Sequence, residues 1–146
     1  MSNRLEMVIP LVPPSINSVG RHWSWKLQQT KKWGGYLMAH RLNNPKFGFE
    51  PESKRYVGVT IYWPHGKLGK RVRLPDDDNV IAGFKPARDL LKKQGFIRED
   101  NPRWSEFEYK IYPAGGINWA AMNSPYLTNF ENDVKTGWTV IVVEDV

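Results

Sequence analysis

Short runs of β-branched and aromatic residues alternate along this chain with segments that have the apolar spacing of helices. Four runs predict strands, namely residues 5–12, 56–63, 106–112 and 138–144. The second run is apolar throughout and predicts a buried strand, whereas the third alternates strictly and predicts a half-exposed one. Pro13 and Pro14 are expected to end the first strand. The order of elements predicts an α+β domain, with helices packed on a mixed sheet.

The first helical segment begins at Ser24, a candidate N-cap. Trp33, Tyr36 and Leu37 recur at helical spacing and are expected to lie in the core. Residues 43–53 contain two prolines and many polar side chains, and they predict a loop. Residues 114–133 show little periodicity and predict a long loop.

The second helical segment runs from Val80 to Gln94. Its apolar positions share one stripe and are Val80, Phe84, Ala87 and Leu91. Pro86 has no amide hydrogen to donate to Ala82, so the helix is expected to bend or restart there. Gly95 is expected to end it.

Composition and charge narrow the class of protein. The 146 residues are 40% hydrophobic and 13% aromatic, which predicts one folded domain over residues 1–146. The net charge of +6 favours an anionic partner such as nucleic acid, although a basic surface without a partner is the alternative. The chain contains no cysteine, which excludes disulfides and thiolate zinc sites. No apolar run suits a signal peptide or a membrane span, so we expect a cytoplasmic protein with no membrane partner.

Three consecutive carboxylates, Asp76, Asp77 and Asp78, precede Asn79 and the second helix. Carboxylates this close repel one another unless something offsets their charge. One interpretation is helix capping by Asp78 or Asn79, with the aspartates at the positive end of the helix dipole. The other is a divalent metal site, because side chains at i and i+2 of an extended backbone point to the same side and carboxylates suit Mg²⁺ or Mn²⁺.

Further charged residues follow these carboxylates. Lys85 lies close to two helical turns after Asp78, on one stripe with Asp89. An ammonium group there is suited to holding a phosphate. Asp100 lies beyond the helix and supplies a third carboxylate, next to Glu99.

Two groups of cations are candidate DNA contacts. One lies directly before the carboxylates and consists of Lys67, Lys70, Arg71 and Arg73. The other is interspersed with aromatic residues and consists of Arg21, Lys26, Lys31 and Lys32. Cations beside carboxylates are the juxtaposition that a phosphodiester-cleaving enzyme needs, whereas a solvated charged face is the ordinary alternative.

The order of these motifs resembles the RusA family of Holliday junction resolvases. The matching pieces are Pro13-Pro14-Ser15-Ile16-Asn17, Asp76-Asp77-Asp78-Asn79, Lys85, Gly95-Phe96-Ile97 and Glu99-Asp100. The version with Lys85-Pro86 is similar to a divergent branch found among phage and prophage proteins. The resemblance implies a RusA-like fold and a homodimeric, Mg²⁺-dependent endonuclease that cuts branched DNA in recombination and repair.

By the same resemblance, Asp76, Asp78 and Asp100 match the metal-binding carboxylates and Lys85 matches the essential lysine. Asp77, Glu99 and Asn79 are candidates for supporting positions around them. A non-catalytic protein that binds branched or single-stranded DNA is the alternative function. A nucleotide hydrolase is disfavoured because the chain has no glycine-rich phosphate loop.

The distance along the chain tests whether the three carboxylates meet. A straight helix from Val80 to Gln94 would be roughly 22 Å long. The five steps from Gly95 to Asp100 reach back at most about 17 Å. Either the helix is bent or shortened at Pro86, or Asp100 meets Asp76 and Asp78 across a dimer interface, and the second is our hypothesis.

Overall fold

Four strands form one mixed sheet in the computed structural model, which describes residues 4–14, 24–48, 52–63, 74, 76–113 and 137–146. The strands are β1 (Arg4–Ile9), β2 (Arg55–Trp63), β3 (Ser105–Pro113) and β4 (Trp138–Asp145). Their order across the sheet is β1-β4-β2-β3. β4 runs antiparallel to β1 and β2, whereas β2 and β3 are parallel. The predicted α+β class with a mixed sheet is therefore confirmed.

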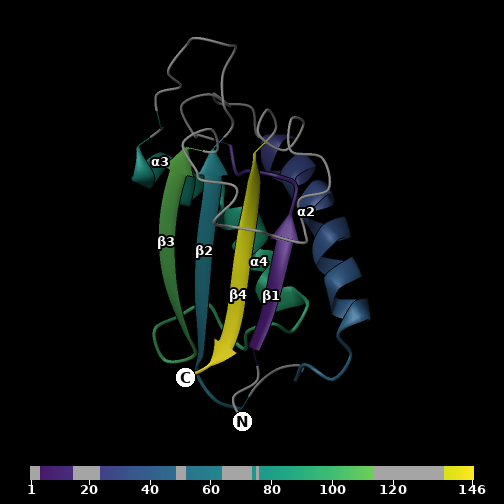
Figure 1. Ribbon diagram of the computed structural model, residues 1–146. Helices are drawn as coiled ribbons and strands as arrows, with labels where there is room; N and C mark the ends of the chain where they lie inside the picture. Colours follow the sequence, from purple (N-terminus) through teal and green to yellow (C-terminus); the bar gives the residue numbers. More distant parts are fainter. Residues whose placement is uncertain (1–3, 15–23, 49–51, 64–73, 75, 114–136) are drawn as a thin grey trace, which may run out of the picture.

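Among the described residues, three helices accompany the sheet, namely α2 (Ser24–Asn43), α3 (Asp77–Gly83) and α4 (Lys85–Lys93). Figure 1 shows α4 behind the sheet, with α2 beside it along the β1 edge. Gly34 of α2 faces the side chain of Leu90 on α4, and the Trp33 ring meets Phe84 edge-on at 5.6 Å between centroids. Within the described part of the chain, no helix combines the length and apolarity that a membrane crossing requires.

Burial alternates along each strand, so one face of the sheet carries the core. Val57, Val59 and Ile61 of β2 are buried, and Ile141 and Val143 of β4 lie beside them. The apolar stripe predicted for the second helix, from Val80 to Leu91, is fully buried against this face. The buried helix face and the buried sheet face form one hydrophobic core.

The predicted second helix is broken rather than continuous. α3 ends at Gly83, Phe84 lies between the helices with φ −79° and ψ −10°, and α4 restarts at Lys85 with Pro86 in its first turn. Proline suits that position because first-turn amides have no partner within the helix. The break at Pro86 is confirmed, and it lies just before the proline.

The end of α4 is closed by the predicted glycine. Gly95 has a φ of 78°, which side chains rarely adopt. The amide of Gly95 donates to the carbonyl of Lys92, and the amide of Phe96 donates to Leu91 at 2.9 Å. These two bonds, with Phe96 and Leu91 both buried, form a Schellman motif.

In β1 and α2, two details of the sequence prediction are wrong. β1 ends at Ile9 rather than Val12, because Pro10 follows and cannot donate to the ladder. Tyr36 is 42% exposed, whereas Trp33 and Leu37 of the same helix are fully buried as predicted.

A buried arginine joins distant segments at the start of β2. Arg55 is 1% exposed, and its Nε donates to the Asp145 carboxylate at 2.9 Å. Its Nη1 donates to the carbonyls of Gly48 and Phe96 at 2.9 and 2.8 Å. The guanidinium also stacks on the Phe47 ring at 4.1 Å. Arg55 therefore ties the C-terminal strand, the turn after α2 and the end of α4 to one point.

Candidate functional site

The three consecutive aspartates lie at one end of the sheet, which we call the α3 end. Here β1, β2 and β3 finish, and α2, α3 and β4 begin (Figure 1). Asp76, Asp77 and Asp78 are all exposed, and Asn79 is half-buried. The α3 end therefore presents three neighbouring carboxylates to solvent.

The geometry of α3 differs from both interpretations of the aspartates, helix capping by Asp78 or Asn79 and a metal site formed by Asp76 and Asp78. Asp76 is the N-cap, with extended φ and ψ of −62° and 139°, and its side chain makes no capping hydrogen bond. Its carbonyl accepts the amides of Asn79 and Val80 at 3.1 and 3.3 Å. Capping by Asp78 or Asn79 is therefore wrong, because both lie inside the helix.

The expected alignment of Asp76 and Asp78 is also wrong. The i and i+2 rule needs extended backbone, and α3 already begins at Asp77. In a helix, side chains two positions apart do not face each other. The placement of Asp77 and Asp78 in the first turn, at the positive end of the helix dipole, is as predicted.

Asp100 pairs with an arginine of α4. Arg88 donates from Nε and Nη2 to one oxygen of Asp100, at 2.6 and 2.5 Å, and from Nη1 to the Tyr109 hydroxyl at 3.2 Å. Burial lowers the pKa of Arg88, but Asp100 and Tyr109 outweigh it and leave that pKa raised. Burial raises the pKa of Tyr109. Asp100 therefore already has a cationic partner within its own chain.

The carboxylates of one chain do not fit a three-ligand metal site. Among the described residues, no group of three or more His, Cys, Asp or Glu side chains is arranged to hold a metal ion. Asp78 lies in α3, whereas Arg88, the partner of Asp100, lies in the separate helix α4. Figure 1 shows the segment between α4 and β3 at the opposite end of the sheet from α3. The break at Pro86 does not bring the two parts together.

Lys85 and Glu99 each form an ion pair along or beside α4. The Lys85 ammonium lies 3.7 Å from the Asp89 carboxylate, one turn later, and both are exposed. Lys92 lies 2.8 Å from Glu99, whose hydrogen bond and charge raise the pKa of Lys92. The expected stripe is thus present for Lys85 and Asp89, while Asp78 belongs to the separate helix α3.

The cations of α2 form the described part of the predicted DNA-contact set. α2 contains Lys26, Lys31 and Lys32 and no Asp or Glu. All three lysines are exposed, and Lys26 lies 5.8 Å from the ring centre of Trp25. The remaining candidates lie outside the described residues and are Arg21, Lys67, Lys70, Arg71 and Arg73.

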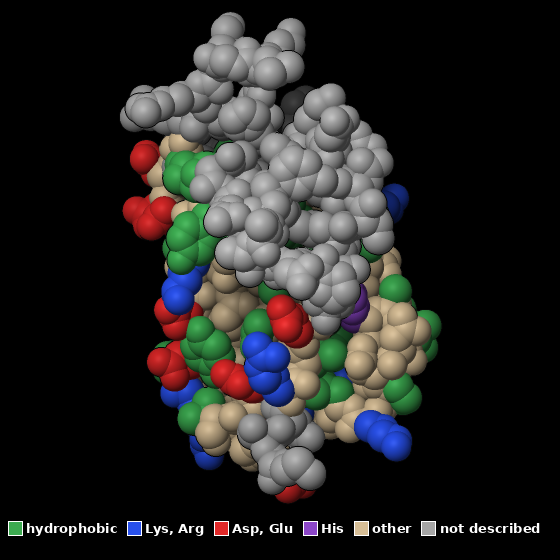
Figure 2. Space-filling view, viewed as in Figure 1, with side chains coloured by type: hydrophobic (Ala, Val, Ile, Leu, Met, Phe, Trp, Pro, Cys, Tyr) green, Lys and Arg blue, Asp and Glu red, His purple; other side chains and the backbone are tan. Residues whose placement is uncertain are grey.

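The face of the sheet turned away from the helices has a different charge. Its exposed or half-buried positions include Glu6, Glu106, Glu108 and Glu144, interspersed with Arg4 and Lys110. Figure 2 shows acidic and basic side chains mixed over this face. A phosphate backbone is repelled by such a face and attracted by the acid-free helix α2.

An aromatic row at the α3 end was not predicted. Tyr62 stacks on Trp138 at 4.6 Å and on Tyr112 at 6.0 Å, because the three residues pair across β4, β2 and β3. Burial, with Tyr112 and Glu6, raises the pKa of Tyr62. Tyr112 is 43% exposed. Each aromatic residue is visible in the sequence, but their adjacency depends on strand order.

A close backbone contact links α3 to the segment that follows β1. Gly83 is buried, and a Cβ built on it would overlap the carbonyl oxygen of Pro14 and lie 2.9 Å from the carbonyl carbon. Glycine therefore allows the Pro13–Pro14 segment to lie against α3. Two motifs that are far apart in the sequence meet here.

The chain was compared with known proteins. No family model matches it, and no curated protein matches it.

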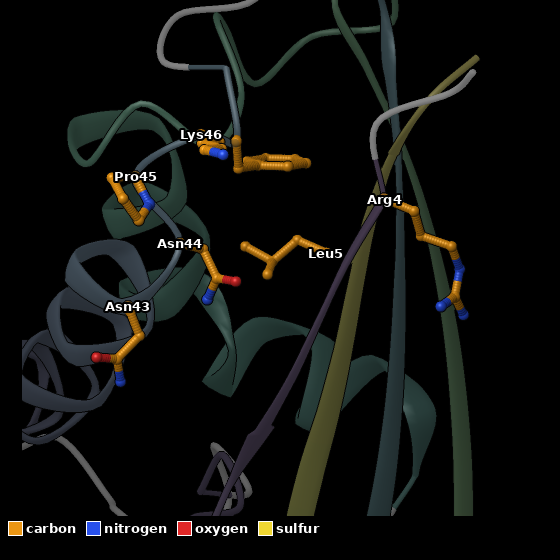
Figure 3. Close-up of a pocket in the computed structure, with 7 residues that line it drawn as sticks. Arg4, Leu5, Asn43, Asn44, Pro45 and Lys46 are labelled. Carbon is orange, nitrogen blue, oxygen red and sulfur yellow. The ribbon is translucent and has the colours of Figure 1, made fainter.

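A surface cavity of about 430 Å³ lies away from the α3 end, where β1 begins and α2 ends (Figure 3). Leu5 and Asn44 point toward each other there, whereas Arg4 points away across the sheet. The Asn44 amide donates to the His40 carbonyl at 2.8 Å, and Arg4 pairs with Glu6 and Glu144. The side chains of Asn44 and Arg4 are thus occupied, and we assign the cavity no role in the site.

Proposed function

We propose that this chain is a structure-selective DNA endonuclease of the RusA type. It acts as a homodimer on four-way junctions or related branched DNA in recombination or repair, in a phage-like or prophage-like branch of that family. Mg²⁺ or Mn²⁺ is the proposed cofactor, and the cytoplasm is the proposed location. The observation that carries the proposal is the separation of charge at the α3 end, where exposed carboxylates begin α3 at the β3 edge and an acid-free cationic helix, α2, begins at the β1 edge.

The cations supply the binding part of this function. Lys31 and Lys32 project from α2 into solvent, and no ion pair among the described residues neutralises them. Such lysines bind phosphates without reading sequence, and their affinity falls with salt. The segment that carries Lys67, Lys70, Arg71 and Arg73 joins β2 to α3, so its two ends enter and leave at the α3 end. A DNA backbone held there lies next to the aspartates.

The contact between Pro14 and Gly83 gives the second line of support. Pro13 and Pro14 belong to the motif that resembles the RusA N-terminal segment, and Gly83 belongs to the helix that begins at the aspartates. The close backbone approach of Pro14 to Gly83 brings the two segments to the same end of the sheet. Their adjacency is what a shared site requires.

Because one chain does not assemble Asp76, Asp78 and Asp100, no catalytic step is assigned to a metal ion within a single chain. The proposed roles are those of the chain's own groups. Asp76 and Asp78 are the proposed catalytic carboxylates at the α3 end, and Lys85 offsets negative charge on the phosphate. Asp77, Asn79 and Glu99 support them.

A non-catalytic protein that binds branched or single-stranded DNA is the second candidate. It is favoured by the ion pair of Asp100 with Arg88, which occupies that carboxylate without any ligand. Both candidates predict salt-dependent binding to junction DNA. Only the first predicts cleavage.

The deciding experiment compares the wild-type chain with Asp78→Asn and the control Glu52→Gln. Each substitution removes one exposed carboxylate charge, but Glu52 lies just before β2 and far along the chain from α3. Binding and nicking of a four-way junction are measured with Mg²⁺ and without it. We expect Asp78→Asn to abolish nicking and to keep or tighten binding, because it removes a negative charge that faces phosphates. Glu52→Gln should cleave as the wild type does.

Nicking that survives Asp78→Asn would show that the proposed carboxylates are wrong. Binding of the junction by the wild type without any nicking would favour the non-catalytic candidate.

A further inference from the structure

Two arginines lie over one tryptophan in the turn between α4 and β3. The guanidinium carbon of Arg98 lies 4.6 Å from the ring centre of Trp104, and that of Arg103 lies 5.3 Å from it. Both arginines are exposed, and Trp104 is half-buried. Contact with a ring restricts a guanidinium, whose fork of N–H donors matches the geometry of a phosphate. We call these three residues the arginine turn.

Hydrogen bonds fix the backbone of the arginine turn. The Asn101 carbonyl accepts the amides of Trp104 and Ser105 at 3.0 and 2.9 Å, and the Asn101 side chain accepts the amide of Arg103 at 3.1 Å. The Trp104 carbonyl accepts the amide of Arg55 at 3.0 Å, which ties the turn to the start of β2. The two guanidiniums are therefore carried by a backbone that is held at both ends.

The acids beside the arginine turn already have cationic partners. Glu99 lies 2.8 Å from the Lys92 ammonium, and Asp100 pairs with Arg88. In the described part of the chain, no carboxylate forms an ion pair with either arginine of the turn. An anion that approaches the arginine turn therefore meets two cations whose charge is not offset there.

The flank of α4 leads from the α3 end to the arginine turn. Arg88 lies in the middle of α4, and its guanidinium carbon is 4.1 Å from the centre of the Phe107 ring, which places this flank beside β3. The one acid of α4, Asp89, lies 3.7 Å from the Lys85 ammonium. Lys93 in the last turn is exposed. A phosphate backbone can therefore follow α4 without meeting an unpaired carboxylate of that helix.

The length of the sheet sets the distance between the arginine turn and the α3 end. Figure 1 shows α3 at one end of the β3 edge and the turn that precedes β3 at the other. β3 has nine residues, which span roughly 30 Å at the rise of a strand. B-DNA advances about 34 Å in one turn of about ten base pairs. A duplex that starts at the α3 end therefore reaches the arginine turn after nearly one helical turn.

We propose that the arginine turn is a second phosphate site, which binds the backbone of a duplex arm about one helical turn from the branch point. This inference rests on the proposed function, because it takes branched DNA held at the α3 end as the ligand. Arg98 and Arg103 bind phosphate oxygens, and Trp104 positions both guanidiniums. Phosphate contacts fix the orientation of a protein on DNA without reading sequence. The second site therefore sets the direction of one arm relative to the carboxylates of α3.

The arm contact is tested with two four-way junctions that share one central sequence. Arms of about 6 base pairs, closed by hairpin loops, end before the arginine turn, whereas arms of about 20 base pairs pass it. Binding of the full chain is measured over a range of salt concentrations and without Mg²⁺, so that the DNA stays intact. The test variant carries Arg98→Gln and Arg103→Gln.

On long arms, we expect the double glutamine variant to lower the slope of log affinity against log salt by about two, because each lost phosphate contact removes about one released counterion. Its affinity should fall about tenfold or more at roughly 0.1 M salt. On short arms it should bind as the wild type does. An unchanged slope on long arms, or an equal loss on both junctions, would overturn the proposal.

Arg4→Gln with Lys46→Gln is the matched control. It removes the same charge, but at the cavity where β1 begins, on the opposite edge of the sheet (Figure 3). It should bind long arms as the wild type does. A loss as large as that of the double glutamine variant would mean that net charge alone is responsible, and the arm contact would be refuted.

Two further measurements separate phosphate binding from a structural role of the arginines. Arg98→Lys with Arg103→Lys keeps both charges but not the flat fork of donors, so it should keep the salt slope and lose part of the affinity. Thermal unfolding is recorded for every variant. A double glutamine variant with a lower Tm and an unchanged salt slope would show that the arginines only cover Trp104, and the proposal would fail.

The outcomes distinguish the arm contact from the proposed function. A wild type that shows the expected difference between the junctions, but cuts neither with Mg²⁺, would refute the endonuclease and support the arm contact. A wild type that cuts both, with a double glutamine variant that binds both equally well, would refute the arm contact and leave the endonuclease standing. A wild type that binds neither junction would refute both.

Discussion

Gly83 of α3 offers a sharp test of how the carboxylate helix is positioned. Replacing glycine by alanine inside an exposed helix stabilises it by about 1 kcal/mol, because glycine loses more backbone freedom on folding. Gly83 is buried, however, and the added methyl group would overlap the carbonyl oxygen of Pro14. The neighbouring atoms are backbone, which cannot move aside as the tip of a side chain can. We therefore expect Gly83→Ala to destabilise the protein.

The expected size follows from these opposing effects. Forcing extra volume into packed structure costs typically 1–3 kcal/mol, and a backbone overlap belongs at the upper end. After the gain in helix propensity, the net loss is about 2 kcal/mol, which for a chain of this length lowers Tm by roughly 6 °C. Thermal unfolding followed by circular dichroism measures it directly.

Gly35 of α2 provides the matched control. It is also a helical glycine, but a Cβ built on it meets nothing within 4 Å. Gly35→Ala should therefore raise Tm by about 3 °C from propensity alone. If Gly83→Ala were as stabilising as Gly35→Ala, the contact between α3 and Pro14 would be refuted.

Three further predictions concern other parts of the molecule. Arg55→Met should cost about 3 kcal/mol in denaturant unfolding, because it leaves a buried network without its donor, and a loss below about 1 kcal/mol would contradict the network. The hydrogen bond from Tyr56 to Glu108, at 2.7 Å, together with burial, raises the pKa of Tyr56 to about 12. Glu108→Gln should therefore lower the pKa of Tyr56 in an ultraviolet titration. Because this pKa is higher in the folded chain than in the unfolded one, the hydrogen bond stabilises the protein below about pH 10, and that stabilisation is lost as the pH rises toward 12. An unchanged titration would exclude the bond. Lys31→Glu should weaken junction binding about fivefold, whereas Lys46→Glu, in the turn that follows α2, should not, and equal effects would mean that α2 does not orient the DNA.

Local features were well predicted from the sequence. The restart of the helix near Pro86 follows from a missing amide donor, and its end at Gly95 follows from a positive φ that glycine alone adopts easily. The strand at residues 56–63 follows from its β-branched and aromatic content. In each case the physical cause lies within a few residues of the feature.

Features that depend on distant contacts were missed. In the sequence, Arg55 looks like an ordinary exposed cation at the start of a strand. In the structure it is buried, because Asp145 and two carbonyls from other segments accept its hydrogen bonds. Asp100 reads as a spare carboxylate until Arg88 is placed beside it. Such partners are set by strand order and by the fold of the turns, which local periodicity does not encode.

The candidate site shows the same division. The sequence indicates that Asp76, Asp77 and Asp78 lie exposed at the start of a helix. Which of these side chains point in the same direction depends on the residue at which α3 begins. If α3 began one residue later, at Asp78, the backbone of Asp77 would be extended. The orientation of carboxylates is therefore less predictable than their presence.

The central claim is that the α3 end binds and cuts branched DNA. The most direct measurement incubates the purified chain with a synthetic four-way junction and with a linear duplex of the same sequence, with Mg²⁺ and without it. The account predicts nicks in the junction that require Mg²⁺, with little cleavage of the duplex. Equal cleavage of both substrates would contradict structure selectivity, and an intact junction under every condition would contradict the endonuclease function.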